Sequence, residues 1–216
     1  MKLIVFPGTA DPKTAYKEVY DLLKQEAKRR NFTEFILKNY PGHYSYDESS
    51  YLSVAEIVKI IHSSILELEE KKESYIVLCR SFGCVPFIEF LKSSPQTPTF
   101  LKKVVLWGVF PFYLWYSYFS MDFTKLTDEF IKNGYRVKPE LFNEIYPVEL
   151  SINEISKDLP FDIYITSGER DDDYPEHFRK FLTAINQNPQ VCFPERIRGE
   201  GHTITKSNKD YFDLIF

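Results

Sequence analysis

Residues 74–91 of the chain read SYIVLCRSFGCVPFIEFL, and this stretch decides the fold. Its first part, Ser74–Cys79, is apolar almost throughout, as is typical of a parallel strand that is covered on both faces. Its last part, Phe82–Leu91, has a helical pattern, with Pro86 in the first turn, where proline is tolerated. The pattern therefore predicts a strand that turns sharply into a helix, with Ser81 at the turn.

Strand and helix patterns alternate along the rest of the chain. The other predicted strands are Lys2–Phe6, Glu34–Leu37, Lys103–Trp107, Phe161–Thr166 and Val191–Ile197. The predicted helices include Pro12–Arg30, Val54–Glu70, Tyr174–Ile185 and a last one from about Thr203 to the C-terminus. Such alternation implies an α/β fold, with about six mainly parallel strands flanked by helices on both faces.

Two of these helices carry start signals in the sequence. Asp11 is a plausible N-cap for the first, because Pro12 then occupies the first helical position. Ser53 and Glu56 have the spacing of a capping box at the start of the second.

One long segment, at residues 109–160, contains no strand pattern. Helical patterns occur at Thr124–Asn133 and Pro139–Ile145. About fifty residues is far longer than the usual connection between two strands, so we expect an insertion with its own role. No linker separates it from the rest, and residues 1–216 are predicted to form a single domain that includes it.

Composition and charge exclude several classes of function. The net charge is −4 and no long stripe of Lys and Arg occurs, so we expect no nucleic-acid partner. The apolar start is too short for a signal peptide, and no stretch approaches the roughly 20 apolar residues of a membrane span, which predicts a cytoplasmic protein. Three cysteines and four histidines without a CxxC pair predict neither a disulfide framework nor a metal site.

Three polar motifs follow predicted strands, at the edge where open α/β sheets bind ligands. The first, Cys79–Gly83, has the form small-x-Ser-x-Gly of a nucleophile elbow, with Cys79 in place of the usual glycine. The second, Gly168–Pro175, contains three consecutive aspartates. The third, Gly199–His202, ends on a histidine.

Taken together, these motifs resemble those of the α/β-hydrolase fold superfamily, in the chain order serine, acid, histidine. Gly168-x-x-Asp171-x-x-Tyr174-Pro175 resembles its acid loop, and Gly199-x-Gly201-His202 its terminal motif. Asn39–His43 resembles its Asp-x-Pro-Gly-His turn, with Asn for Asp. The insertion lies where the superfamily carries a helical lid.

The resemblance implies a role for each of five residues. Ser81 would be the nucleophile, His202 its general base and Asp171 the acid that orients the imidazole. The spacing from Gly168 and to Pro175 selects Asp171 among the adjacent acids, and Asp172 is the runner-up. A run of acids is otherwise usually just solvated. The backbone N–H groups of Phe82 and Thr9 would form the oxyanion hole, although Pro7-Gly8 stands where the superfamily usually has His-Gly.

The implied activity is hydrolysis of a small carboxylic ester, or of a thioester or amide, through an acyl-enzyme on Ser81, without cofactor or metal. Two alternatives stay open on sequence. The same triad can serve an acyltransferase or a lyase. The departures at Cys79 and Pro7 also leave room for a non-catalytic ligand-binding protein of the same fold.

Two further features have competing interpretations. The aromatic run within Phe110–Phe119 predicts a wall for an apolar acyl or aryl group of a small-molecule substrate, with Phe110, Phe112 and Trp115 as candidates. Alternatively, these rings seal the insertion against the sheet or form a dimer contact. Arg80 could reach the mouth of the pocket and meet an anionic group, or form a structural salt bridge.

Overall fold

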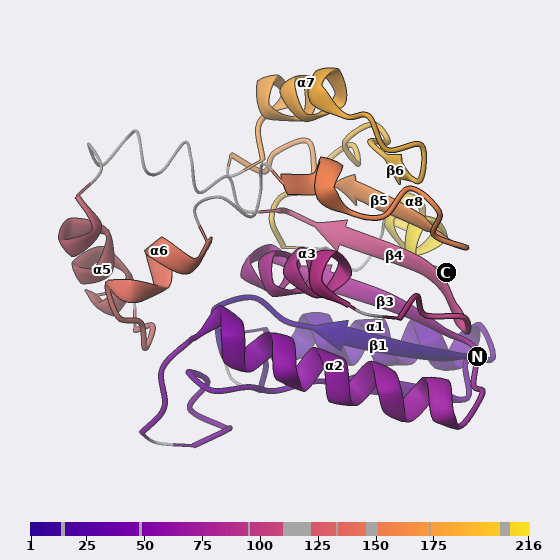
Figure 1. Cartoon of the computed structure of the whole chain (residues 1–216), viewed down its shortest axis with the longest axis horizontal. Helices are drawn as coiled ribbons and strands as arrows, with labels where there is room; N and C mark the ends of the chain where they lie inside the picture. The colour runs from indigo at the N-terminus through magenta and orange to yellow at the C-terminus, as the bar shows by residue number, and fades with distance from the viewer. Residues whose placement is uncertain are drawn as a thin grey trace.

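The computed structural model describes residues 1–13, 16–47, 49–94, 96–109, 122–132, 134–145, 151–172, 174–203 and 208–216. Its strands are β1 (Lys2–Phe6), β2 (Glu34–Leu37), β3 (Tyr75–Arg80), β4 (Leu101–Trp107), β5 (Asp162–Thr166) and β6 (Val191–Cys192). They form one six-stranded sheet in the order β2-β1-β3-β4-β5-β6, and every pairing is parallel (Figure 1). The α/β fold class predicted from the sequence is confirmed.

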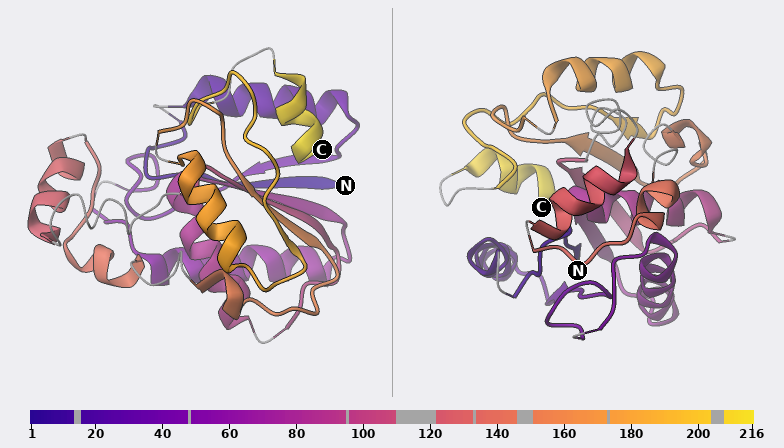
Figure 2. Two further views of the ribbon diagram at one scale, coloured as in Figure 1. Left: turned by 90° about the horizontal axis from the view of Figure 1, so that it is seen from above. Right: turned by 90° about the vertical axis from the view of Figure 1, so that its left-hand side faces the viewer.

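Helices cover both faces of this sheet. The described helices are α1 (Lys17–Arg29), α2 (Val54–Glu70), α3 (Cys84–Ser93), α5 (Phe123–Lys132), α6 (Glu140–Ile145), α7 (Glu176–Ile185) and α8 (Lys209–Ile215). Leu3 and Val5 belong to the same buried cluster as residues of α1 and α8, whereas Ile4 and Phe6 belong to the cluster that includes residues of α2, α3 and α7. Figure 2 shows α1 and α8 together on one face, opposite α2 and α3. This alternation follows from the two-residue period of a strand.

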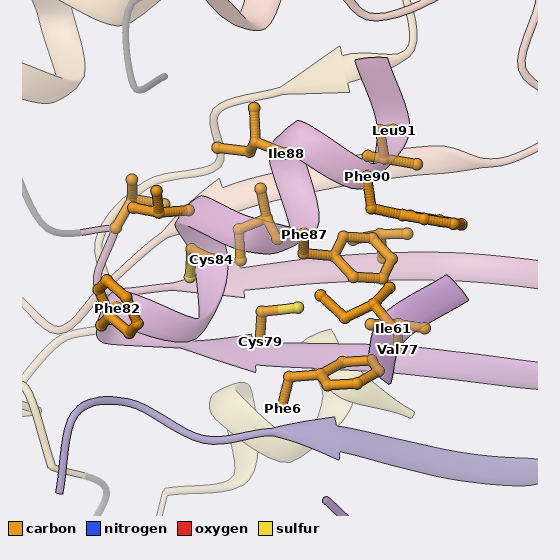
Figure 3. Packing of buried hydrophobic residues seen from close by; sticks show 14 of the residues in the cluster. Phe6, Ile61, Val77, Cys79, Phe82, Cys84, Phe87, Ile88, Phe90 and Leu91 are labelled. Atoms are coloured by element: carbon orange, nitrogen blue, oxygen red, sulfur yellow. The ribbon is translucent and has the colours of Figure 1, made fainter. Parts of the chain in front are cut away.

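The central strand β3 and the helix that follows it form the middle of the core. All six residues of β3 are buried, in agreement with the apolar sequence that precedes its last residue, Arg80. Figure 3 shows Cys79 and Cys84 among the apolar side chains that join β3 and α3 to β1. Close packing here fixes the position of the turn that contains Ser81.

The two predicted helix starts have different outcomes. Ser53 caps α2, and its hydroxyl accepts from the Glu56 N–H (3.4 Å). The prediction that Asp11 caps a helix from Pro12 was wrong, since α1 begins at Lys17. The Asp11 carboxylate instead accepts from the Lys13 N–H (2.8 Å) and from the Ser45 N–H (2.5 Å), and so joins the loop after β1 to the loop after β2.

The last strand and helix are shorter than the sequence predicted. β6 ends at Cys192, because Pro194 has no N–H to donate to a ladder, and pairing resumes only as an isolated bridge between Gly168 and Ile197. The last helix begins at Lys209, not near Thr203, and residues 204–207 lie outside the described ranges.

Between β4 and β5 the described part of the chain contains α5, α6 and a short 3₁₀ turn, η2 (Ser151–Glu154). Figure 1 shows α5 and α6 beyond the carboxyl ends of the strands. The Val54 N–H at the start of α2 donates to the Glu144 carboxylate (2.8 Å), which ties α6 to the main body. The boundaries of a lid at 109–160 stay a prediction. None of the described helices is long and apolar enough to cross a membrane.

Candidate active site

Ser81 occupies a strained turn at the carboxyl end of β3. Its φ is +50°, in the left-handed region, and a 3₁₀ turn, η1 (Ser81–Gly83), leads directly into α3. A non-glycine residue in this region costs about 1–2 kcal/mol, and such strain persists only where the surroundings enforce it. The sequence therefore places a serine hydroxyl on a sharp strand-to-helix turn at the cost of some stability.

Close packing at Gly83 shows what enforces this turn. A Cβ at Gly83 would lie 2.2 Å from the Pro7 carbonyl oxygen and 2.7 Å from that of Phe6. Only glycine lets the start of α3 approach the end of β1 so closely. Cys79, at the position of the motif's first small residue, is fully buried in the core. Burial raises the pKa of its thiol well above the usual range, so this cysteine stays a neutral core residue at neutral pH.

The loop after β1 lies beside Ser81. A Cβ at Gly8 would lie 3.0 Å from the Ser81 Cβ and 3.5 Å from its Oγ. The Gly8 carbonyl accepts from the Tyr40 hydroxyl (3.1 Å) and lies 3.0 Å from the His43 Nε2. In a trans peptide the N–H points away from the C=O, so the Thr9 N–H points away from Tyr40 and His43. No described residue accepts a hydrogen bond from it.

Two residues of the Asn39–His43 turn thus support the Gly8–Thr9 peptide. Tyr40 and His43 are both buried and stack on each other, with ring centroids 4.3 Å apart. The Asn39 side-chain oxygen lies 2.6 Å from the His43 Nδ1 and orients the imidazole. Sequence reasoning found this turn but not its contact with Gly8, which joins segments that lie more than thirty residues apart.

Asp171 and His202 come together after β5 and β6. The Asp171 Oδ2 lies 3.0 Å from the His202 Nδ1, and the Asp171 side chain is 1% exposed whereas that of His202 is 26% exposed. A neutral imidazole that donates its Nδ1–H to this carboxylate keeps a lone pair on Nε2 and can act as a base. Asp172, the runner-up, is exposed.

Backbone bonds fix the loops that contain these two residues. The Arg170 N–H donates to the Glu200 carbonyl (2.7 Å), and the Ile197 N–H donates to the Ser167 carbonyl (2.9 Å). The Arg196 guanidinium donates to the Asp171 carbonyl (2.8 Å). The acid and the histidine are therefore held by main-chain contacts as well as by their own hydrogen bond.

Gly108, directly after β4, is a site residue that sequence reasoning missed. Its φ is +61°, and a Cβ there would lie 2.9 Å from the His202 Cε1 and 3.1 Å from the Asp171 Oδ2. The signal in the sequence was a glycine immediately after the apolar strand that ends at Trp107. Its lack of a side chain leaves the space in which the imidazole and the carboxylate meet.

Gly108→Ala is therefore expected to displace the imidazole and to lower kcat/KM for an ester substrate about 100-fold, since a displacement of about 1 Å can cost that much. Gly134→Ala is the matched control: its φ is +83°, but a Cβ there meets nothing within 4 Å. Both variants incur the strain of a positive φ, about 1 kcal/mol, and Gly108→Ala adds the cost of the contact with His202. Equal activity of the two variants would contradict the placement of Gly108.

The remaining residues predicted for the site are three aromatic candidates and Phe82. Phe110, Phe112 and Trp115 fall outside the described residues. Phe82 is buried at the elbow, directly after Ser81 (Figure 3). Within the described ranges, no group of three or more His, Cys, Asp or Glu side chains could hold a metal ion.

Similarity to known proteins is found in structure only. No protein-family model and no curated protein matches the chain. Mouse alpha/beta hydrolase domain-containing protein 10 superimposes with a TM-score of 0.64 at 15% identity, covering 99% of this chain and 86% of that one. A monoacylglycerol lipase of Paleococcus ferrophilus gives 0.62 at 15% identity, covering 99% and 91%. A structure from work on carboxylesterases of Nitrososphaera gargenis gives 0.60 at 10% identity, covering 93% and 82%. The chain therefore has the α/β-hydrolase fold.

Proposed function

We propose that the protein is a serine hydrolase that cleaves a small carboxylic ester, or a thioester or amide, through an acyl-enzyme on Ser81. The observations that carry this proposal are the pairing of a buried Asp171 with a partly exposed His202 and the positive φ of Ser81 at the end of β3. A helix N-cap serine needs no such backbone, and a surface histidine needs no buried carboxylate.

The first half of the reaction forms the acyl-enzyme. The Ser81 Oγ attacks the substrate carbonyl carbon while its proton passes to the His202 Nε2. Asp171 keeps the imidazole in the tautomer that can accept this proton and stabilises the imidazolium that results. The oxyanion accepts hydrogen bonds from the Phe82 and Thr9 N–H groups. As the tetrahedral intermediate collapses, the alcohol leaves with the proton from Nε2.

The second half repeats these steps with water. His202 removes a proton from a water molecule, whose oxygen attacks the acyl carbon. Collapse returns the proton to the Ser81 Oγ and releases the carboxylic acid. No step requires a metal or an organic cofactor, because the charge that develops is neutralised by backbone N–H groups and by the Asp171 carboxylate.

The proposed substrate class rests on the aromatic sequence after β4 and on the structures of similar fold. The aromatic run that contains Phe110, Phe112 and Trp115 follows β4 in the sequence. Gly108, the residue directly after β4, lies against the Asp171–His202 pair. We infer that residues 109–160 form a lid and that these rings contact an apolar acyl or aryl group. The lipase and the carboxylesterase work among the structures of similar fold support ester chemistry as the first choice.

Steady-state hydrolysis tests this proposal. We expect turnover of p-nitrophenyl esters with acyl chains of about two to eight carbons, with kcat/KM rising with chain length as more apolar surface is buried. Thioesters and anilides of the same acyl group should be cleaved more slowly. A folded protein that releases no more product than its Ser81→Ala variant from any of these substrates would contradict hydrolysis and would favour the ligand-binding alternative.

A further inference from the structure

Arg80, the residue immediately before Ser81, is a buried cation. Alternation along β3 places its side chain on the face of the sheet that α1 and α8 cover, together with Ile76 and Leu78. The residue is only 3% exposed. It therefore neither reaches the mouth of a pocket nor lies on the surface, so the first interpretation drawn from the sequence was wrong.

The guanidinium binds the backbone of the candidate general base. The Arg80 Nη2 donates to the His202 carbonyl oxygen (3.0 Å), and the Trp107 Nε1 donates to the same oxygen (3.2 Å). These two donors come from the ends of the adjacent strands β3 and β4. His202 is thus fixed to the sheet through its own main chain, independently of its imidazole contact with Asp171.

Among the described residues, no carboxylate forms an ion pair with Arg80, so the salt bridge considered from the sequence is not found in this part of the chain. The Arg80 Cζ lies 5.3 Å from the Tyr16 ring centroid and 5.6 Å from that of Tyr20, which are cation–π distances. Its Nη1 lies 3.5 Å from the Tyr20 hydroxyl, a long hydrogen bond. Its Nε has no hydrogen-bond partner among the residues that the structure describes. The aromatic rings stabilise the cation only in part.

Such an arrangement is weak evidence for a role in stability. Replacing buried charged groups with apolar groups of similar volume is often neutral or stabilising. A methionine would fill the same space without the desolvation cost. What methionine lacks is the N–H group that reaches the His202 carbonyl, and this difference points to a role in holding the histidine.

The Tyr20 hydroxyl is the other polar group beside the guanidinium. Burial raises the pKa of the Tyr20 hydroxyl, and both the Arg80 cation and the Gly8 backbone amide oppose this rise. Arg80 accordingly joins the end of β3, directly before Ser81, to the main chain of His202.

We propose that Arg80 is a positioning residue: its guanidinium holds the His202 main chain in the geometry that lets the imidazole accept the Ser81 proton. This role rests on the proposed hydrolase function. It predicts that Arg80 affects kcat much more than KM, because the guanidinium touches no substrate.

Three variants test the role kinetically. Arg80→Met is expected to lower kcat for the best ester about 10- to 100-fold with KM within about twofold of the wild type, the loss typical of a misplaced catalytic group. Arg80→Lys, which keeps a cationic donor, should recover part of this loss. Arg29→Met, which removes an exposed arginine, is the control and should behave as the wild type. Thermal unfolding should show that Arg80→Met is no less stable than the wild type.

Nitrogen-15 NMR of the histidine side chains gives a second readout, independent of turnover. The chain has four histidines, so His202→Gln identifies the His202 signals. In the neutral imidazole, His202 should be an Nδ1–H tautomer in the wild type and a tautomer mixture in Arg80→Met.

The outcomes of these experiments are distinguishable. Absence of any Ser81-dependent turnover in the wild type would remove the hydrolase function, while the NMR comparison would still measure the effect of Arg80 on His202. An unchanged His202 tautomer together with wild-type kcat in Arg80→Met would overturn the proposal. So would a loss in Arg80→Met that comes with a lower unfolding temperature, a raised KM and no recovery in Arg80→Lys.

Discussion

Ser81→Ala is expected to lower kcat/KM for the best ester of the panel by about 10⁴- to 10⁶-fold, the range seen when a triad nucleophile is removed. The physical reason is that the two thiols nearest to it in the sequence cannot replace it. Cys79 and Cys84 are both buried, and burial raises the pKa of each thiol well above its usual range. Hydrolysis measured against heat-denatured protein gives the residual rate.

Ser81→Gly is a second variant, which removes the hydroxyl without adding backbone strain. Glycine adopts φ = +50° without the cost that a side chain brings, whereas alanine does not. Ser81→Gly should therefore unfold at a higher temperature than Ser81→Ala, because its free energy of unfolding is larger by about 1 kcal/mol. Both variants should be equally inactive. Activity in either variant close to that of the wild type would remove Ser81 from the mechanism.

Asp171→Asn is expected to lower kcat/KM about 10⁴-fold with little change in fold, because the neutral amide stabilises the wrong imidazole tautomer and no longer stabilises the imidazolium. The 3.0 Å contact between the Asp171 Oδ2 and the His202 Nδ1 is the basis of this expectation. Steady-state kinetics at saturating and limiting substrate measure both kcat and kcat/KM.

The neighbouring Asp172→Asn variant is the matched control. It removes the same charge one residue away, but from an exposed side chain, and should leave kcat/KM within about twofold of the wild type. If instead Asp172→Asn is the inactive variant and Asp171→Asn is active, the assignment of the acid is reversed. This pair of variants decides the choice that the sequence left open.

Periodicity predicted the sheet well because each central strand is buried on both faces. In β1 and β3 the apolar runs end at a proline or at polar residues, which mark the strand ends in the sequence itself. Asp11 was misassigned for the opposite reason. An aspartate before a proline has the local pattern of a helix cap, but here a distant residue, Ser45, provides donors that the pattern cannot reveal.

The candidate site divides in the same way between local and distant contacts. Ser81, Asp171 and His202 could be predicted because each stands in a short motif after a strand. The supporting contacts could not, since they join residues far apart in the chain. The Arg80–His202 hydrogen bond spans 122 positions, and no local pattern marks a buried arginine whose partner is a backbone carbonyl.

The most direct test of the hydrolase proposal is the intact mass of the protein after treatment with a fluorophosphonate, which reacts only with an activated serine. We predict a single adduct on the wild-type protein, located at Ser81 by peptide mapping and absent from Ser81→Ala. Folded wild-type protein that acquires no adduct, or an adduct that persists in Ser81→Ala, would contradict an activated Ser81 at this turn.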